Sequence, residues 1–308
     1  MKLAEWNSRV FLVVGDLGFG VTEPFAKRFP DRYLNAGVAE QNMTGVAAGL
    51  ALSGKIVFTY SIANFPILRC LEQIRNDVCY HHANVKVVAV GGGFAYGSLG
   101  ATHHATEDLA IMRALPEMSV VAPGDPEEAA AATEAVASHD GPCYLRLGRA
   151  GERKVHHRPI HFQLGKAIQV REGSDITLIS TGGMLQTSVE TAAALSQRGL
   201  QARVLSMHTL KPLDVSAVLT AARETSAIFT LEEHSIVGGL GSAVAETLAE
   251  SAEHEVAFKR FALPSAFACK SGTQEYLRAQ FGLGVQQLSD AIYAWSQEGS
   301  LLAASESF

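Results

Sequence analysis

The sequence predicts an α/β fold of two domains, each a mostly parallel sheet flanked by helices. Two observations lead to it. Short runs rich in β-branched residues alternate with helical segments, and these runs are continuously apolar, as in parallel strands covered on both faces. The alternation breaks once, in a polar, basic stretch near 148–165. We therefore predict one domain over residues 1–150, a linker over 151–164 and a second domain over 165–308.

The strand predictions follow from the apolar runs. In the first domain they are Val10–Val14, Ile56–Tyr60, Val85–Val90, Ser119–Ala122 and Cys143–Leu147. In the second they are Ile176–Ser180, Ala202–Ser206, Ile228–Leu231 and Val256–Phe261.

Helices are expected between these strands. Asp125 is a candidate N-cap, followed by Pro126 and two glutamates, which predicts a helix that runs to Ser138. Leu185–Arg198 and Ala243–Ser251 are helical in pattern as well. The linker histidines, His156, His157 and His161, are explained by a solvated basic segment, so we predict no metal site there.

Composition limits the class of protein. The chain has 308 residues, 47% hydrophobic and 18% charged, which suits a globular protein with two substantial cores. Its formal charge of −6 argues against a nucleic-acid partner. No apolar run approaches the ~20 residues that span a bilayer, and Glu5 falls where a signal peptide would be apolar. Four scattered cysteines fit a reducing cytoplasm, so we expect a cytoplasmic protein without a membrane partner.

Two segments at predicted carboxyl ends of strands, where parallel sheets bind ligands, are candidate site elements. Gly15–Gly20 holds three glycines, which permits a tight turn near a ligand but fits an ordinary βα turn equally well. Glu40 stands at the start of a helix of small and apolar residues that ends before Gly54. A carboxylate beside a buried helix is costly unless paired, whereas a first-turn glutamate is also favoured by the helix dipole. From the residues alone, both interpretations stay open.

Segments along nearly the whole chain, in order, resemble the pyrimidine-binding and C-terminal domains of transketolases and deoxyxylulose-phosphate synthases. They are Gly37–Met43 with Ala47–Ala51, Phe58–Ser61, Leu68–Arg75, Gly100–His104 (similar to Gly-x-Thr-His-Gln), Glu107–Pro116, Val120–Pro123, Thr181–Met184, Glu232–His234 and Gly238–Gly241. The resemblance implies a transferase of two-carbon ketol units between a ketose and an aldose, dependent on thiamine diphosphate.

The resemblance also implies roles for individual residues. Glu40 matches the carboxyl group that hydrogen-bonds the pyrimidine ring, and burial would favour its neutral, proton-donating form. His103 matches the histidine that faces the substrate oxygens. Glu40 and His103 are thus the expected catalytic residues. Four residues are expected beside the cofactor, with Phe65 stacked on the pyrimidine: Phe65, Tyr60, Arg69 and Asp16. Four more are expected beside the substrate, with the two arginines at its phosphate: His104, Leu99, Arg146 and Arg149.

Two positions depart from the family pattern. Sugar-phosphate transketolases commonly carry a His and an Asp in the loop before the Thr-His pair, where this chain has Gly91 and Leu99. Leu99 cannot accept a hydrogen bond from a substrate hydroxyl, so discrimination at that hydroxyl should be weaker. We therefore expect an unusual sugar or sugar-phosphate substrate instead of the standard pentose phosphates.

The family's N-terminal domain, which binds the diphosphate and its metal ion, has no counterpart in this sequence. The resemblance thus implies that a separate N-terminal subunit supplies the diphosphate grip and the Mg²⁺ or Ca²⁺ site, in an α2β2 heterotetramer. We predict no metal ligand in this chain, and neither tight cofactor binding nor turnover by the chain alone.

Two alternatives stay open. The β subunit of a 2-oxo-acid dehydrogenase is also split, although Thr102-His103 and the C-terminal half favour a transketolase. A non-catalytic α/β regulatory module could use Gly238–Gly241 for a nucleotide, but that cluster lacks an acidic residue at dinucleotide spacing, and such a module should have lost Glu40.

Overall fold

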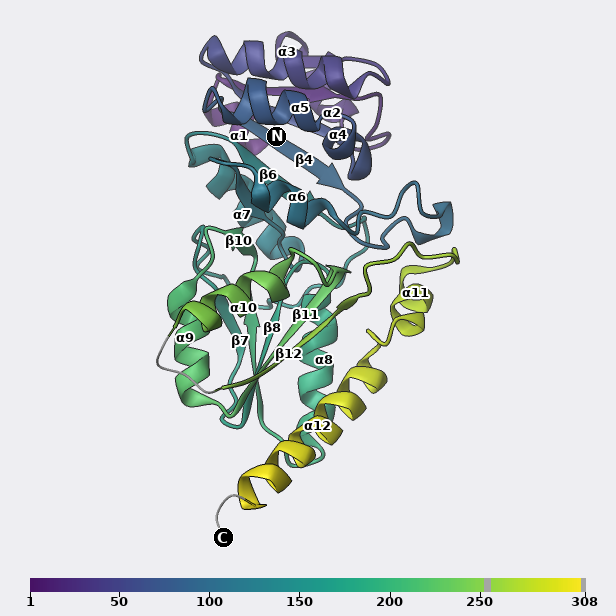
Figure 1. The fold of residues 1–308 in the computed structure, drawn as a ribbon. Helices are drawn as coiled ribbons and strands as arrows, with labels where there is room; N and C mark the ends of the chain where they lie inside the picture. Colours follow the sequence, from purple (N-terminus) through teal and green to yellow (C-terminus); the bar gives the residue numbers. More distant parts are fainter. Residues whose placement is uncertain (252–255, 306–308) are drawn as a thin grey trace.

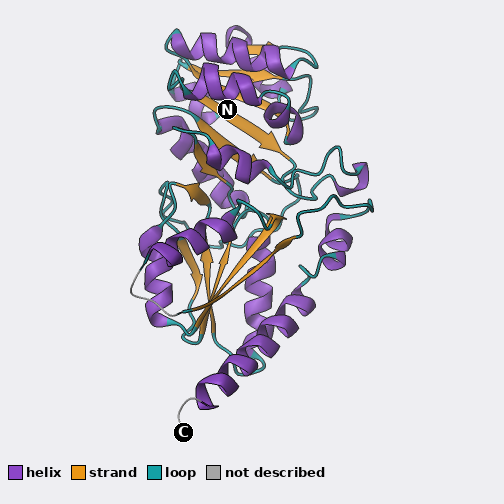
Figure 2. Ribbon diagram, viewed as in Figure 1, coloured by secondary structure: helices purple, strands orange, loops and turns teal. Residues whose placement is uncertain are grey.

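The computed structural model describes residues 1–251 and 256–305, with side chains up to residue 297. Two sheets dominate it, one in each half of the chain (Figures 1 and 2). A seven-stranded sheet has the order β10-β5-β6-β4-β3-β1-β2, and a five-stranded sheet has the order β12-β11-β8-β9-β7. Helices flank both sheets, which confirms the predicted fold class. None of the helices in the described ranges is long and apolar enough to cross a membrane.

Six strands of the larger sheet come from the first half and pair in parallel. They are β1 (Val10–Val14), β2 (Tyr33–Asn35), β3 (Ile56–Ile62), β4 (Val85–Val90), β5 (Ser119–Val121) and β6 (Cys143–Leu147). Five of them fall on the predicted apolar runs. The sixth, β2, is a short edge strand with two exposed residues, so it carries no apolar run that could have announced it.

Helices cover both faces of this sheet. They are α1 (Lys2–Trp6), α2 (Glu23–Arg28), α3 (Glu40–Leu52), α4 (Asn64–Leu68), α5 (Leu71–Gln73), α6 (Asp108–Ala114) and α7 (Pro126–Ser138), with the short turns η1 (Pro30–Arg32), η2 (Ile74–Cys79) and η3 (Gly97–Leu99). One core cluster joins α3, α4 and α6 to the sheet, and another joins α1, α2 and α7 to its other face. Asp125 caps α7 as predicted, because its side chain accepts the backbone N–H of Glu128.

The smaller sheet is built from β7 (Ile168–Arg171), β8 (Ile176–Ser180), β9 (Ala202–Ser206), β11 (Ala227–Ser235) and β12 (Ala257–Leu263). Its helices are α8 (Met184–Ser196), α9 (Val215–Glu224), α10 (Leu240–Glu250), α11 (Gln274–Gln280) and α12 (Val285–Ser305). Helices α8 and α12 pack together on one face, and α9 and α10 on the other (Figure 1). Strand β7 is an antiparallel edge strand with no fully buried residue, and no apolar run predicted it.

The two halves are joined by more than the chain. Strand β10 (Thr209–Lys211) leaves the second half and pairs antiparallel with β5 of the first. Its residue Leu210 is buried in a core cluster that also holds Met43 of α3 and Ile228 of β11. The predicted boundary between two domains at 151–164 therefore stays a proposal. Strand β10 comes from the second half but pairs in the sheet of the first.

The segment between the halves corrects one expectation. His156 is not solvated. It is buried, its ring lies 2.8 Å from Glu128 of α7, and its backbone N–H donates to Asp125 at 2.8 Å. The hydrogen bond to Glu128 raises the pKa of His156. No local pattern reveals this partner, because Glu128 is 28 positions away. The linker is thus fastened to α7.

Candidate active site

Glu40 is the centre of the candidate site. It is the first residue of α3 and is almost fully buried, with 1% of its side chain exposed. Its Oε2 accepts a hydrogen bond from Nη1 of Arg69 at 2.7 Å, and Arg69 itself is half exposed. The guanidinium offsets part of the cost of burying the carboxylate. The chain thus places a carboxyl group inside the first half with one partner that reaches in from the surface.

The second oxygen of Glu40 is different. Oε1 is buried and has no hydrogen-bond partner in the described part of the chain, and the same is true of the Ser61 hydroxyl. Both groups border Gly15, where a Cβ atom would lie 3.5 Å from Glu40 Cγ and 3.5 Å from Ser61 Oγ. Buried polar atoms are almost always hydrogen-bonded. Oε1 is therefore available to a water or to a partner from outside this chain.

A row of side chains leads outward from Glu40. The Arg69 guanidinium lies 5.2 Å from the centroid of the Phe65 ring, a cation–π distance. The Phe65 ring in turn lies 5.3 Å from the His103 ring in an edge-on arrangement. Four of the residues that the sequence singled out thus form one contiguous row, although they come from three separate segments.

Asn64 of α4 holds the segment that carries His103. Its amide nitrogen donates to the backbone oxygen of His104 at 2.6 Å and to that of Thr102 at 3.3 Å. The Thr102 hydroxyl lies 3.0 Å from Nδ1 of His103. His103 is half buried, so its ring is positioned yet reachable.

His104 does not share this position. It is buried, its Nε2 lies 3.2 Å from the backbone oxygen of Gly97, and its ring packs edge-on against Phe94. His104 thus lies inside the loop, and its Nδ1 is buried without a partner among the described residues. Its contact with the substrate stays a prediction.

Gly91 is explained by Tyr96. Gly91 is buried with φ +96°, and a Cβ atom there would lie 2.2 Å from the Tyr96 ring. Tyr96 thus fills the space that a side chain at position 91 would need. The Arg149 guanidinium lies 5.6 Å from the centroid of the Tyr96 ring and is exposed. Leu99 is 53% exposed on the turn η3.

Tyr60 and Asp16 lie at the carboxyl ends of adjacent strands. Burial raises the pKa of the Tyr60 hydroxyl, and nearby Tyr96 adds to that rise. Asp16 is exposed, and its carboxylate accepts from the Asn35 amide at 2.8 Å. It follows Gly15, which faces Glu40. Both residues therefore border the site from the first strands of the sheet.

Arg146 is one of the two arginines expected at the substrate phosphate. Its guanidinium is buried and donates to both oxygens of Asp108, from Nε at 2.7 Å and from Nη2 at 3.2 Å. Nη2 also donates to the backbone oxygens of Ala105 and Glu233, at 2.8 and 3.1 Å. These contacts commit Arg146 to the junction between the halves. Arg146 also lines a small pocket with Glu152 and Arg278, so its contact with a substrate phosphate stays a prediction, as does that of the exposed Arg149.

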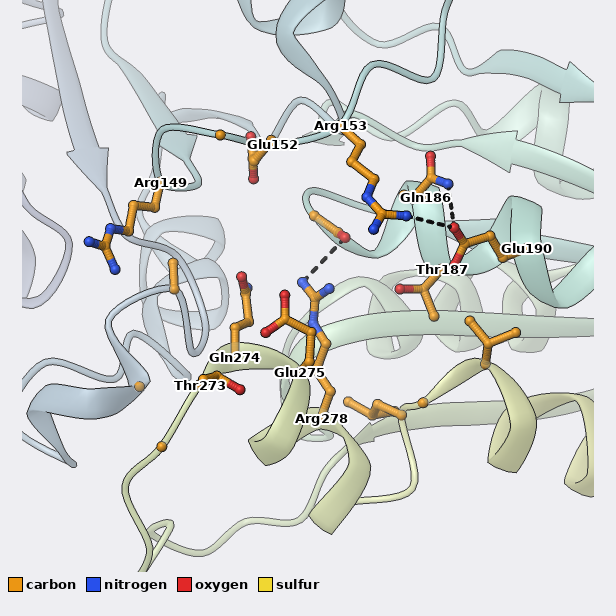
Figure 3. A pocket seen from close by; sticks show the side chains of 18 of the residues that line it. Arg149, Glu152, Arg153, Gln186, Thr187, Glu190, Thr273, Gln274, Glu275 and Arg278 are labelled. Carbon is orange, nitrogen blue, oxygen red and sulfur yellow. Dashed lines mark hydrogen bonds and ion pairs between the residues drawn. The ribbon is translucent and has the colours of Figure 1, made fainter.

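A pocket of about 680 Å³ lies between the two halves (Figure 3). The residues around it include Arg149, Glu152, Arg153, Gln186, Glu190 and Arg278. Burial of the carboxyl end raises the pKa of Glu152 to about 7, although the residue as a whole is exposed. Glu40 and His103 do not line this pocket. We place the reaction at Glu40 because one of its oxygens is buried and unpaired among the described residues.

Ser61, Asn64 and Tyr96 are site residues that the sequence did not reveal. Ser61 directly follows Tyr60 on β3, and successive strand residues point to opposite faces, so the expectation for Tyr60 did not extend to it. Asn64 bonds to residues 38 to 40 positions away, and Tyr96 packs on Gly91 across a tight loop. No local sequence pattern reveals such contacts. Within the described ranges, no group of three or more His, Cys, Asp or Glu residues is arranged to hold a metal ion.

Comparison with protein-family models gives two matches. Residues 1–153 match the pyrimidine-binding domain of transketolase, and residues 165–288 match the transketolase C-terminal domain.

Individual relatives agree. The chain is 41% identical over 253 residues to the B subunit of the apulose-4-phosphate transketolase of Phocaeicola vulgatus, covering 82% of this chain and 81% of that one. It is 38% identical over 294 residues to the 6-deoxy-6-sulfo-D-fructose transketolase subunit SqwH of a Clostridium species, covering 95% and 90%.

Solved structures are similar as well. A structure described as a split gene transketolase, inactive beta4 tetramer, superposes with a TM-score of 0.86 at 39% identity, over 95% of this chain and 93% of that one. A transketolase from Campylobacter jejuni shares the fold, with a TM-score of 0.77 at 18% identity, over 95% of this chain and 44% of its own length.

Proposed function

The chain belongs to the transketolase family, and we propose that it is the C-terminal subunit of a split, thiamine-diphosphate-dependent enzyme that moves a two-carbon ketol unit from a ketose to an aldose. The observation that carries the proposal is Glu40, a buried carboxylate with one oxygen paired and the other free. The names of the relatives favour this function over a 2-oxo-acid dehydrogenase component. A non-catalytic module would have no use for an unpaired buried carboxylate oxygen.

The residues around Glu40 fit an aminopyrimidine ring. Oε1 and the Ser61 hydroxyl offer hydrogen bonds, the Gly15 backbone lies close to both, and Phe65 offers an aromatic ring at the rim. When bound, thiamine diphosphate supplies a nucleophilic carbon and an electron sink.

The chain's own part is to place protons. Arg69 fixes the orientation of the Glu40 carboxyl through Oε2, which leaves Oε1 to exchange a proton with a ring nitrogen. His103, held at the rim by Thr102 and Asn64, can donate to a substrate oxygen on which negative charge develops. The two groups lie at opposite ends of the Arg69–Phe65 row, so each can serve a different proton transfer.

The proposal requires a partner. One relative is named as the B subunit of its transketolase and another as a transketolase subunit, which supports a separate diphosphate-binding partner for this chain. We propose that this partner holds the diphosphate and its Mg²⁺ or Ca²⁺ ion, in an α2β2 assembly. The related beta4 tetramer is described as inactive, which is what we expect of this chain without its partner.

For the substrate we propose a ketose that differs from xylulose 5-phosphate near its reactive carbon and ends in an anionic group. Leu99 offers no hydrogen bond, and Tyr96 fills the space at Gly91. Arg149 is exposed and free to bind a phosphate or a sulfonate. The relatives are named for apulose 4-phosphate and 6-deoxy-6-sulfo-D-fructose, a phosphate and a sulfonate, which supports an anionic end of the substrate.

The test is reconstitution with the diphosphate-binding partner and a panel of ketose donors. We expect ketol transfer with an unusual anionic ketose, and a loss of at least about 100-fold in Glu40→Gln, since general acid–base catalysis contributes that much. The matched control is Glu127→Gln, another first-turn glutamate, which is exposed and should leave the rate unchanged.

Three outcomes would contradict the proposal. Unchanged turnover in Glu40→Gln would support a non-catalytic module. Xylulose 5-phosphate and ribose 5-phosphate as the best pair by a wide margin would overturn the substrate assignment. Tight binding of thiamine diphosphate by the isolated chain in calorimetry would overturn the shared site.

A further inference from the structure

We propose that Glu233, in the second half of the chain, is a positioning residue for the loop that carries Leu99 and His103. The inference rests on the proposed function only where it concerns the reaction. The contact between Glu233 and the loop is a property of the folded chain. Glu233 lies near the end of β11, and only 3% of it is exposed.

The carboxylate of Glu233 is a meeting point of three segments. Oε1 accepts a short hydrogen bond from the backbone N–H of Phe94, in the first half, and Oε2 forms a short ion pair with Arg278 of α11. The Gln274 side chain donates to both oxygens, at 2.9 and 3.1 Å. Hydrogen bonds to a charged group are stronger than those between neutral groups. Glu233 therefore ties the first half to α11 through one charged group.

Phe94 lies at the base of the loop. The loop leaves β4 and closes on itself, because Gly93 and Ala105 exchange backbone hydrogen bonds at 2.8 and 3.0 Å. Gly93 has φ +63°, and a Cβ atom there would lie 2.3 Å from Glu233 Oε1. A glycine at position 93 thus lets the carboxylate reach the loop base. The residues enclosed by this closure, 94–104, include both Leu99 and His103.

The tip of the loop meets the same part of the second half. The segment between β12 and α11 runs alongside η3 (Figure 1), and the Gly272 N–H donates to the Gly97 oxygen at 3.2 Å. A Cβ atom at Gly97 would lie 2.6 Å from Leu277 and 2.7 Å from the Gly272 oxygen. The Phe94 ring stacks on Phe281 at 5.6 Å. Base and tip are therefore both held by β11, α11 and their flanking residues.

The consequence concerns His103. On one side Asn64 of the first half holds the backbone on either side of it, and on the other side Glu233 and α11 hold the loop base and tip. Misplacing a catalytic group by about 1 Å can cost roughly 100-fold in rate. The second half, which does not contribute a side chain to the Glu40 row, thus sets the position of the substrate-facing histidine.

Glu232 provides a matched control. It is the adjacent glutamate, fully buried, and its two oxygens accept from the backbone N–H groups of Leu240 and Gly241 at the start of α10. The hydrogen bonds of its carboxylate therefore all lie within the second half. Glu233→Gln and Glu232→Gln each remove one buried carboxylate from the same strand, and only the first touches the loop.

The first readout is hydrogen–deuterium exchange of the backbone amides of 94–104 in the intact wild-type and variant chains. Glu233→Gln should speed exchange in this segment by at least about tenfold, as expected when a closed segment opens more readily. Glu232→Gln should leave the segment at the wild-type rate. Equal exchange in Glu233→Gln and wild type would overturn the inference, whether or not the chain proves to be a transketolase.

The second readout is kinetic, in the pair reconstituted with the diphosphate-binding partner. Glu233→Gln should raise KM for the ketose at least about fivefold and lower kcat, because the loop no longer holds its groups in place. Its affinity for thiamine diphosphate should stay within about twofold, since the Glu40 row is intact. Faster exchange with unchanged KM and kcat would make Glu233 merely structural and would overturn its positioning role. A wild-type pair without ketol transfer would instead count against the proposed function.

Gly97→Ala keeps the test available if Glu233→Gln does not fold. Its methyl group would press on Leu277 and Gly272 without touching Glu233, and it should displace the loop tip. We expect the same rise in KM. Gly45→Ala, at a position of α3 with open space for a Cβ atom, is the control and should not raise KM. A wild-type KM in Gly97→Ala would contradict the positioning of the loop by the second half.

Discussion

Arg69 Nη1 lies 2.7 Å from Glu40 Oε2, while Glu40 Oε1 has no partner among the described residues. One carboxyl group is thus divided between a fixed oxygen and a free one. The fixed oxygen sets the orientation of the group, and the free one is available for chemistry. Removing Arg69 should therefore disturb the carboxyl group measurably.

Arg69→Met removes the partner of a buried carboxylate. We expect it to lower the free energy of unfolding by roughly 1–2 kcal/mol, less than for a fully buried pair because Arg69 is half exposed. The measurement is urea denaturation of Arg69→Met, Glu40→Gln and the double variant. The double variant should lose less than the sum of the single losses. Strict additivity would mean that the two side chains do not interact in solution.

Leu99→Asp restores an acceptor where the family commonly has one. Leu99 is exposed on a turn, so the fold should tolerate the change. We expect kcat/KM for xylulose 5-phosphate to rise about tenfold relative to the chain's own best donor, because a hydrogen-bonding site discriminates on the hydroxyl it binds. The control is Ser98→Asp, which adds the same charge one position away. An equal gain in both variants would indicate a charge effect alone.

His156→Ala should cost about 1–3 kcal/mol of stability near pH 6, because Glu128 loses a buried partner. The pKa of His156 is raised in the folded chain by its hydrogen bond to Glu128. The contribution of this hydrogen bond to stability is therefore complete below the ordinary histidine pKa of 6.5, and it is lost as the pH rises through the raised pKa. Denaturation at pH 6 and pH 9 should show the difference between wild type and variant shrinking. Exposed His157→Ala should show none.

Glu232→Gln, like His156→Ala, should make stability fall less as the pH rises, but for a different reason. Burial is the main cause that raises the pKa of Glu232 to about 7 from 4.5. Between these values the unfolded chain has lost the proton and the folded chain has kept it, so wild-type stability falls as the pH rises. The loss amounts to at most roughly 3 kcal/mol. Denaturation from pH 4.5 to pH 8 should show wild type losing stability relative to Glu232→Gln. Parallel curves would contradict the raised pKa.

The sequence predicted the strands with apolar runs and missed those without. Strands β1, β4, β6, β8 and β9 begin and end where the runs do. The missed strands, β2, β7 and β10, are short and lie at sheet edges. Only one neighbour pairs with an edge strand, so its residues need not be apolar throughout. Burial on both faces leaves a trace in the sequence, whereas pairing at an edge does not.

The site was predictable where a motif carried it and hidden where tertiary contacts did. Family resemblance points to Glu40, Phe65 and His103, and the structure brings them into one row. The sequence does not show that Asp108 binds Nε and Nη2 of Arg146, so the tie of this arginine to α6 was hidden. Glu233 stands out in the sequence only as part of a Glu-Glu-His segment, since its partner Phe94 is 139 positions away.

Strand β10 also bears on whether the chain can be cut between its two halves. Its backbone covers the edge of β5, whose N–H and C=O groups would otherwise be unpaired and could bind the strands of other chains. A break between the two halves would strip that cover from the first half and expose apolar surface around Leu210. Fission at residues 151–164 would thus yield a fragment prone to aggregate. The two halves should therefore be more soluble as one chain than as separate fragments.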